Sequence, residues 1–119
     1  HDMGDDNLAE TFTYVARELG KRGIAFICSR EKEGADSLGP QLKEAFGGVY
    51  IANERFTKDS ANAWLASGKA DAVAFGVPFI ANPDLPARLK ADAPLNEARP
   101  ELFYAKGPVG YIDYPTLPA

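Results

Sequence analysis

The sequence predicts an α/β fold built around a parallel sheet. Three short apolar runs alternate with segments in which apolar residues recur at helical spacing. This rhythm is typical of βα units. With 45% hydrophobic and 25% charged residues, the 119-residue chain has the balance of one globular unit. We expect βα units over residues 1–90 and an irregular, proline-interrupted tail over residues 91–119.

The first element is predicted to be a helix. Four apolar residues recur at helical spacing: Leu8, Phe12, Val15 and Leu19. Asn7 and Glu10 have the spacing of a side-chain pair that caps a helix start. Gly20 and Gly23 are expected to end the helix. Because a parallel sheet normally starts on a strand, we expect a further strand before this helix.

A strand, a helix and a second strand follow. Residues 24–29 form a short apolar run between a glycine and a charged cluster, which suits a strand buried on both faces. Cys28 in this run is interpreted as a packed apolar residue rather than a reactive thiol. A helical stripe over residues 38–46 closes at Gly47, and residues 49–52 are the second predicted strand.

The last elements are shorter. Thr57 is expected to cap a third helix, which Trp64 anchors and Gly68 ends. Residues 70–75 are the third predicted strand, and residues 84–90 form one more short helix.

Charge and composition argue against several classes of partner. A net charge of −4 disfavours nucleic acid, whose binding needs clustered Lys and Arg. A single cysteine and the single histidine, His1, give neither a disulfide nor a metal site. No run approaches the roughly 20 apolar residues of a membrane span. The sequence therefore predicts a cytoplasmic protein without nucleic-acid, membrane or metal partners.

Two loops after predicted strands are candidate ligand sites, because parallel α/β folds bind ligands at the carboxyl ends of strands. Ala52 and Asn53 lead into the first loop, and Gly76 and Val77 form the second. Glycine allows a backbone N–H to approach an anion closely, and a helix start adds a favourable dipole. Gly76 is equally compatible with a plain tight turn.

The segment after the third strand reads Gly76-Val77-Pro78-Phe79-Ile80-Ala81-Asn82-Pro83-Asp84-Leu85. It resembles the strand-eight signature of the Old Yellow Enzyme family of FMN-dependent ene reductases. The tail resembles the C-terminal segment of the same family at four places in the same order: Leu95-Asn96, Arg99-Pro100-Glu101, Phe103-Tyr104 and Gly110-Tyr111-Ile112-Asp113-Tyr114-Pro115. The resemblance runs from Met3 to Leu117.

The resemblance implies strands six to eight of a TIM barrel, followed by an irregular tail. It implies that the backbone at Ala52, Asn53, Gly76 and Val77 holds the FMN phosphate, and that Tyr104 lines the substrate side of the flavin. Val77 departs from the family, which often has Arg or Lys at this position. The proton donor and the carbonyl-binding pair belong to earlier strands, so no catalytic residue is assigned in this chain.

The implied function is part of an NADPH-dependent ene reductase that reduces activated C=C bonds in enones, enals, maleimides and nitroalkenes. The chain alone is expected to be inactive and to need a complementary chain carrying barrel strands one to five. Two alternatives stay open for the charged loop over residues 30–33, which is either solvated or in contact with substrate. The alternative function is a stand-alone, non-catalytic α/β module that binds a phosphate-bearing ligand.

Overall fold

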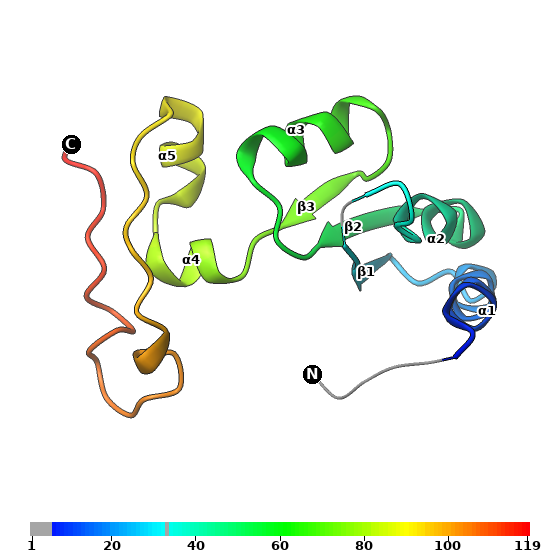
Figure 1. Ribbon diagram of the computed structural model, residues 1–119, viewed down its shortest axis with the longest axis horizontal. Helices are drawn as coiled ribbons and strands as arrows, with labels where there is room; N and C mark the ends of the chain where they lie inside the picture. The colour runs from blue at the N-terminus through cyan, green and yellow to red at the C-terminus, as the bar shows by residue number, and fades with distance from the viewer. Residues whose placement is uncertain (1–5, 33) are drawn as a thin grey trace. The chain divides into compact units, whose positions relative to one another are not determined.

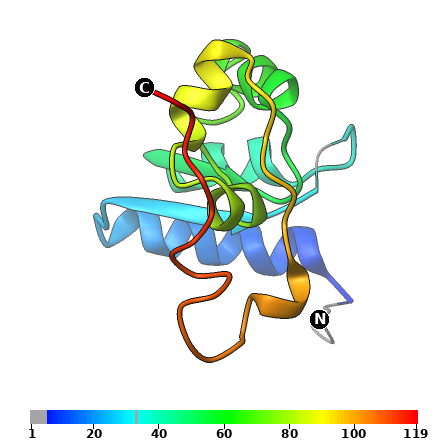
Figure 2. The ribbon, with the colours of Figure 1, turned by 90° about the vertical axis from the view of Figure 1, so that its left-hand side faces the viewer.

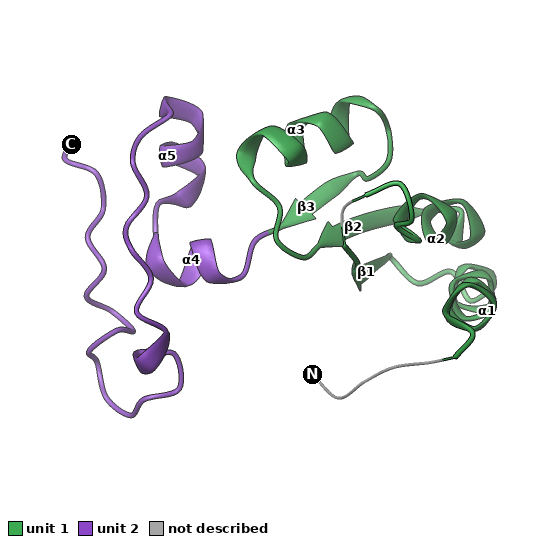
Figure 3. Cartoon of the chain, in the orientation of Figure 1, with its two compact units in different colours: residues 1–74 green, residues 75–119 purple. Residues whose placement is uncertain are grey.

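The computed structural model describes residues 6–32 and 34–119. The chain divides into two compact units, His1–Ala74 and Phe75–Ala119 (Figure 3). The first unit contains α1 (Leu8–Lys21), β1 (Phe26–Arg30), α2 (Gly39–Phe46), β2 (Val49–Asn53), α3 (Lys58–Ala66) and β3 (Ala72–Ala74) (Figure 1). The second unit contains α4 (Val77–Ala81), α5 (Leu85–Ala91) and the 3-10 helix η1 (Pro100–Leu102). Among the described residues, no helix has the length and apolar character needed to cross a membrane.

The three strands form one parallel sheet in the order β1-β2-β3, as the sequence predicts. Their bounds differ slightly from the prediction. β1 begins at Phe26 and ends at Arg30, β2 extends to Asn53, and β3 is confined to Ala72–Ala74. Residues next to β3 still join the sheet, since the Asp71 N–H donates to the Tyr50 carbonyl at 2.9 Å.

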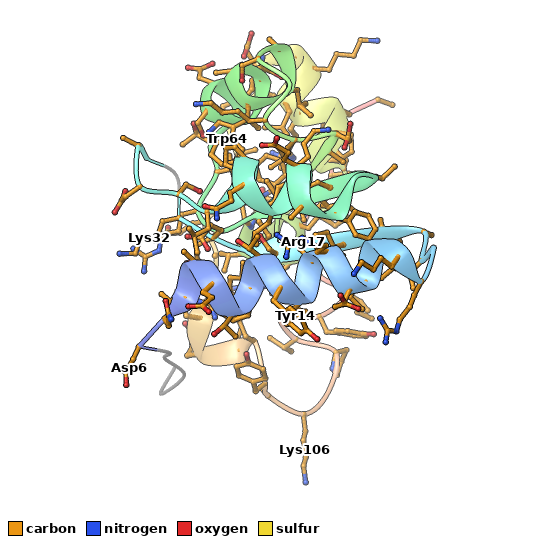
Figure 4. The ribbon with its side chains drawn as sticks, turned by 90° about the vertical axis from the view of Figure 1, so that its right-hand side faces the viewer. Asp6, Tyr14, Arg17, Lys32, Trp64 and Lys106 are labelled. Atoms are coloured by element: carbon orange, nitrogen blue, oxygen red, sulfur yellow. The ribbon has the colours of Figure 1, made fainter. Side chains whose placement is uncertain are left out.

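Helices cover one face of this sheet. Tyr50 and Ala52 on β2 are buried, and the Tyr50 hydroxyl shares a hydrogen bond of 2.5 Å with Ser29 on β1. Trp64 of α3 is 7% exposed and meets Phe56 edge-on at 5.1 Å between ring centroids. Trp64 therefore anchors α3 in the core, as predicted (Figure 4).

The other face of the sheet is largely uncovered in the first unit. Phe26 and Val49 pair across β1 and β2 on this face and are 52% and 47% exposed. Cys28, on the same face, is also exposed. The predictions that this strand is buried on both faces and that Cys28 is packed are therefore wrong, because none of the described helices and strands of the unit lies against β1 on this face. Val73 pairs with Ala52 and so lies on the helix-covered face.

The start and end of α1 differ from the prediction. The Asn7 side-chain amide donates to the Glu10 carboxylate at 2.5 Å, and Asn7 does not cap the helix backbone with its side chain. Gly20 does not end the helix, which continues to Lys21; Gly23 follows with a φ of 66°. Gly20 serves close packing instead, since a Cβ there would lie 2.2 Å from the Phe46 carbonyl oxygen.

The predicted boundaries of α2 and α3 are confirmed. Gly47 ends α2 in the left-handed conformation, with a φ of 74°. The Thr57 hydroxyl accepts the Ser60 N–H at 3.2 Å, and the Ser60 hydroxyl accepts the Thr57 N–H at 3.0 Å. This reciprocal capping box satisfies backbone groups at the start of α3. Gly68, with a φ of 75°, follows α3.

The second unit combines two short helices with the irregular tail that the sequence predicts. The tail leaves α5, forms a loop that includes η1, and returns past α4 and α5 (Figure 2). The predicted helix over residues 84–90 corresponds to α5.

Gly20→Ala tests the close approach of α1 and α2. Alanine is normally the better helix former by about 1 kcal/mol. Here its methyl group would collide with the Phe46 carbonyl, so we expect a loss of about 1 to 3 kcal/mol in the free energy of unfolding. Urea unfolding of the intact protein measures this loss, with Thr11→Ala on an exposed position of α1 as the control. A Gly20→Ala variant as stable as the parent would contradict the packing.

Candidate functional site

The first candidate loop begins where β1 and β2 end together. Arg30 and Asn53 are register partners at the carboxyl edge of the sheet. The Glu31 N–H donates to the Asn53 carbonyl at 3.0 Å, which extends the pairing one residue beyond the strands. The loops after both strands therefore start at the same edge, where α/β folds place ligands.

The turn after Asn53 has an unusual backbone. The Asn53 side-chain oxygen accepts the Glu54 N–H at 2.8 Å. Glu54 and Arg55 have φ values of 114° and 58°, in the region that favours glycine. Such outliers are costly and cluster at ligand sites. The sequence pattern gave no signal for them, because neither residue type predicts a positive φ.

Three charged side chains meet at this turn. The Arg30 guanidinium donates to the Glu54 carboxylate, and this hydrogen bond is the main reason that the pKa of Glu54 is lowered. The Arg55 Nε lies 3.3 Å from the other Glu54 oxygen. The Arg55 side chain is 90% exposed. Two cations therefore share one carboxylate, which leaves a net positive charge where an anion is expected. Arg30, predicted as either solvated or in contact with substrate, is engaged with Glu54.

A groove in the first unit runs from an apolar wall to this charged turn. Its apolar lining includes Leu8, Phe12, Val15, Leu19 and Ile27. Its polar end is lined by Arg30, Glu31, Lys32, Glu54 and Arg55. Figure 4 shows Tyr14 and Arg17 of α1 and Lys32 of the loop after β1. Within residues 6–32 and 34–119, no group of three or more His, Cys, Asp or Glu side chains could hold a metal ion.

The second candidate loop starts the second unit at Gly76. The Gly76 carbonyl accepts the N–H groups of Phe79 and Ile80, so α4 begins directly after this residue. The first N–H groups of a helix have no partner inside it. A Cβ at Gly76 would meet no atom within 4 Å, and the φ of −90° does not require glycine. Gly23, Gly47, Gly68 and Gly107 share this open space but have positive φ values, so Gly76 is distinguished by open space beside a backbone that does not require glycine.

These features fit a phosphate group. Val77 is 50% exposed, so its side chain does not close the space beside Gly76. Ala52 is 2% exposed and could contribute only through its backbone, whereas Asn53 is half-buried. Each loop by itself therefore has main-chain groups that could hold an anion, and the second loop has no charged side chain at Val77.

Tyr104 lies in the tail of the second unit and is 98% exposed. Lys106 projects from the same part of the tail (Figure 4). Of the two tyrosines in the last segment of the resemblance, Tyr114 is buried, and its hydroxyl accepts the Arg99 N–H at 2.9 Å. Tyr111 is 83% exposed, and the polar contacts of Asp113 and Tyr114 hold this part of the tail.

The segment that carries the strand-eight resemblance holds the tail. The Arg88 side chain is 6% exposed and donates to Asp84 at 2.7 Å, to the Pro94 carbonyl at 2.6 Å and to the Pro115 carbonyl at 2.9 Å. The second Asp84 oxygen accepts the Leu117 N–H at 2.7 Å. That bond, followed by the Arg88 bond, lowers the pKa of Asp84.

Asn82 and Asn96 add a second set of bonds. The Asn82 side chain is buried, donates to the Pro78 carbonyl at 2.9 Å and accepts the Asn96 N–H at 2.7 Å. The Asn96 amide donates to the carbonyls of Ala81 and Pro115, both at 2.8 Å. Sequence reasoning located this segment by resemblance but did not assign a role to Arg88.

The chain is similar in sequence and structure to known proteins, although no protein-family model matches it. It is 37% identical over 126 residues to 12-oxophytodienoate reductase 2 of Arabidopsis thaliana, covering 98% of this chain and 33% of that protein. It is 37% identical over 123 residues to a probable flavin mononucleotide-dependent alkene reductase of Leishmania infantum, with the same coverage of 98% and 33%. The old yellow enzyme homologue of Zymomonas mobilis superposes with a TM-score of 0.89 at 38% identity, over 95% of this chain and 34% of that chain.

The chain belongs to the Old Yellow Enzyme family. It spans about one third of the length of the curated relatives that it matches. Its parallel strands and helices are consistent with part of the α/β barrel of Old Yellow Enzymes. The assignment to strands six to eight stays a prediction, as do the site residues.

Replacing Arg55 tests the strain at the charged turn. Arg55→Gly is expected to be more stable than Arg55→Ala by about 1 to 2 kcal/mol, because both lose the same exposed ion pair and only glycine adopts the left-handed backbone without cost. Urea unfolding of the intact protein measures the difference. At Asn62, an exposed position in α3, the control pair should behave in the opposite way: Asn62→Ala should be more stable than Asn62→Gly. Equal stability of the two Arg55 variants would show that the turn is unstrained.

Proposed function

We propose that this chain is the part of an NADPH-dependent FMN ene reductase that holds the phosphate end of the flavin. The main support is the similarity to a flavin-dependent relative, together with the position of Gly76 after β3, where parallel α/β folds bind ligands. A relative at 37% identity over 98% of the chain is a probable flavin mononucleotide-dependent alkene reductase. The relative indicates that the cofactor is a flavin, and the loop at Gly76 is the proposed place for the flavin phosphate.

The backbone at Ala52, Asn53, Gly76 and Val77 would hold the phosphate. When bound, FMN supplies the relay of a hydride from NADPH to an activated alkene. The exposed guanidinium of Arg55 adds positive charge next to the first of these loops. Tyr104 would line the substrate side. The proposed substrates are enones, enals, maleimides and nitroalkenes.

The partner we propose is a complementary chain, or chain segment, that carries barrel strands one to five. The uncovered sheet face presents Phe26 and Val49, and a groove between α1 and β1 is lined by further apolar side chains. Burying one large apolar side chain contributes roughly 1.5 to 3 kcal/mol. Several such burials are comparable to a typical domain stability of about 5 to 15 kcal/mol. The chain alone is therefore expected to lack both a stable fold and activity.

The alternative function, a stand-alone binding module, would use the same loops. It is not favoured, because the relatives include alkene reductases.

Two neighbouring substitutions should change flavin binding in opposite directions. Gly76→Val has room in the fold but fills the space proposed for the phosphate, so FMN should bind roughly tenfold more weakly or worse. Val77→Arg restores a charge at a half-exposed position and should tighten binding by about tenfold. Fluorescence titration of the assembled apo-enzyme with FMN gives both constants.

Asn62→Arg is the control for added charge. Asn62 is an exposed residue of α3 and belongs neither to the candidate loops nor to the uncovered sheet face. FMN affinity of this variant should equal that of the parent. If Gly76→Val also leaves FMN affinity unchanged, this loop does not hold the phosphate.

Reconstitution tests the partner. The 119-residue chain should be colourless and inactive with FMN and NADPH, and mixing with a fragment carrying strands one to five should restore alkene reduction. Phe26→Asp on the uncovered face should abolish this recovery, because it places a charge in an apolar contact. Asn62→Asp on the exposed side of α3 should not. Full turnover by the chain alone would refute the requirement for a partner.

A further inference from the structure

The tail of the second unit forms a loop whose two ends are joined. We call residues 97–114 the tail loop. The residues on either side of it are linked directly, since the Asn96 amide donates to the Pro115 carbonyl at 2.8 Å. Tyr104 lies inside this loop, remote in sequence from both ends. Its position therefore depends on what holds those ends.

Asp84 and Arg88 hold both ends. The Arg88 guanidinium bonds the Pro94 carbonyl before the loop and the Pro115 carbonyl after it. Asp84 orients the guanidinium with one oxygen and bonds the Leu117 N–H with the other. We call these two residues the tail latch. The arrangement uses the planar, several-donor guanidinium, which the single ammonium of lysine cannot reproduce.

A second set of contacts joins the beginning and the end of the tail loop itself. The Arg99 guanidinium donates to Asp113 at 2.8 Å and lies 4.5 Å from the centre of the Tyr114 ring. Asp113 also accepts the Gly110 N–H at 2.7 Å. Gly110, with a φ of 78°, packs against Leu102, which a Cβ at Gly110 would approach to 2.5 Å. The loop is thus internally braced, so a change at its ends would move it as a body.

We infer that Asp84 and Arg88 are positioning residues for the substrate side of the enzyme: they fix the tail loop and, through it, Tyr104. The buried guanidinium supports this role, because a charge out of water must keep its partners and so holds its acceptors in one geometry. The inference rests on the proposed substrate role of Tyr104. It gives Asp84 of the signature segment, and Arg88 just after it, a task separate from the phosphate loop, since both residues contact the tail.

Arg88→Lys in the intact holoenzyme tests the latch. The variant keeps the charge but cannot bond both carbonyls and Asp84. Tryptic cleavage after Lys106, next to Gly107 in the tail loop, should become roughly tenfold faster in the native state. The KM for cyclohexenone should rise several-fold, while kcat and bound FMN stay near the parent values. Lys90→Ala, at an exposed position of the same helix, should change none of these.

A double-mutant cycle with Tyr104→Ala separates the latch from the proposed function. If the latch acts through Tyr104, Arg88→Lys should raise KM in the parent but not in the Tyr104→Ala background. An equal rise in both backgrounds, or an unchanged cleavage rate at Lys106, overturns the inference while leaving the ene-reductase proposal intact. If cleavage accelerates but neither Tyr104→Ala nor Arg88→Lys changes KM, the substrate role of Tyr104 fails and the positioning role fails with it. Absence of any alkene reduction or FMN binding in the intact protein counts against the proposed function itself.

Discussion

The Arg88 guanidinium is buried, so its charge and its N–H groups must find partners inside the protein. One partner is Asp84, a turn earlier in the chain, and the others are carbonyls of Pro94 and Pro115. Few side chains of the tail are apolar and buried, so the order of the tail depends on these polar bonds more than on a hydrophobic core. The segment over residues 82–88 and the tail are therefore joined by polar bonds, of which the Arg88 guanidinium makes two.

The first unit depends on a different constraint. Its sheet is covered by helices on the side of Tyr50 and Ala52, while Phe26 and Val49 on the other side stay about half exposed. Parallel sheets are normally covered on both faces. The uncovered face is thus the strongest physical reason to expect further barrel strands against this chain.

The two candidate loops offer anion binding by different means. At the first loop, Arg30 and Arg55 share the Glu54 carboxylate, and two residues hold a backbone that favours glycine. At the second, Gly76 offers open space and no side-chain charge. Val77 lacks the basic group that the family often has, whereas the first loop carries the exposed guanidinium of Arg55.

The sequence by itself determined the order of the elements, the parallel sheet, the Thr57 cap and the left-handed Gly47, because helical periodicity, capping and turn chemistry act between near neighbours. It also located the two loops, whose role in FMN binding stays a prediction. Only the tertiary structure decided that Gly20 packs against Phe46, that Glu54 has a positive φ, and that Arg88 joins the tail. Each of these depends on contacts between residues far apart in the chain, which no local pattern encodes.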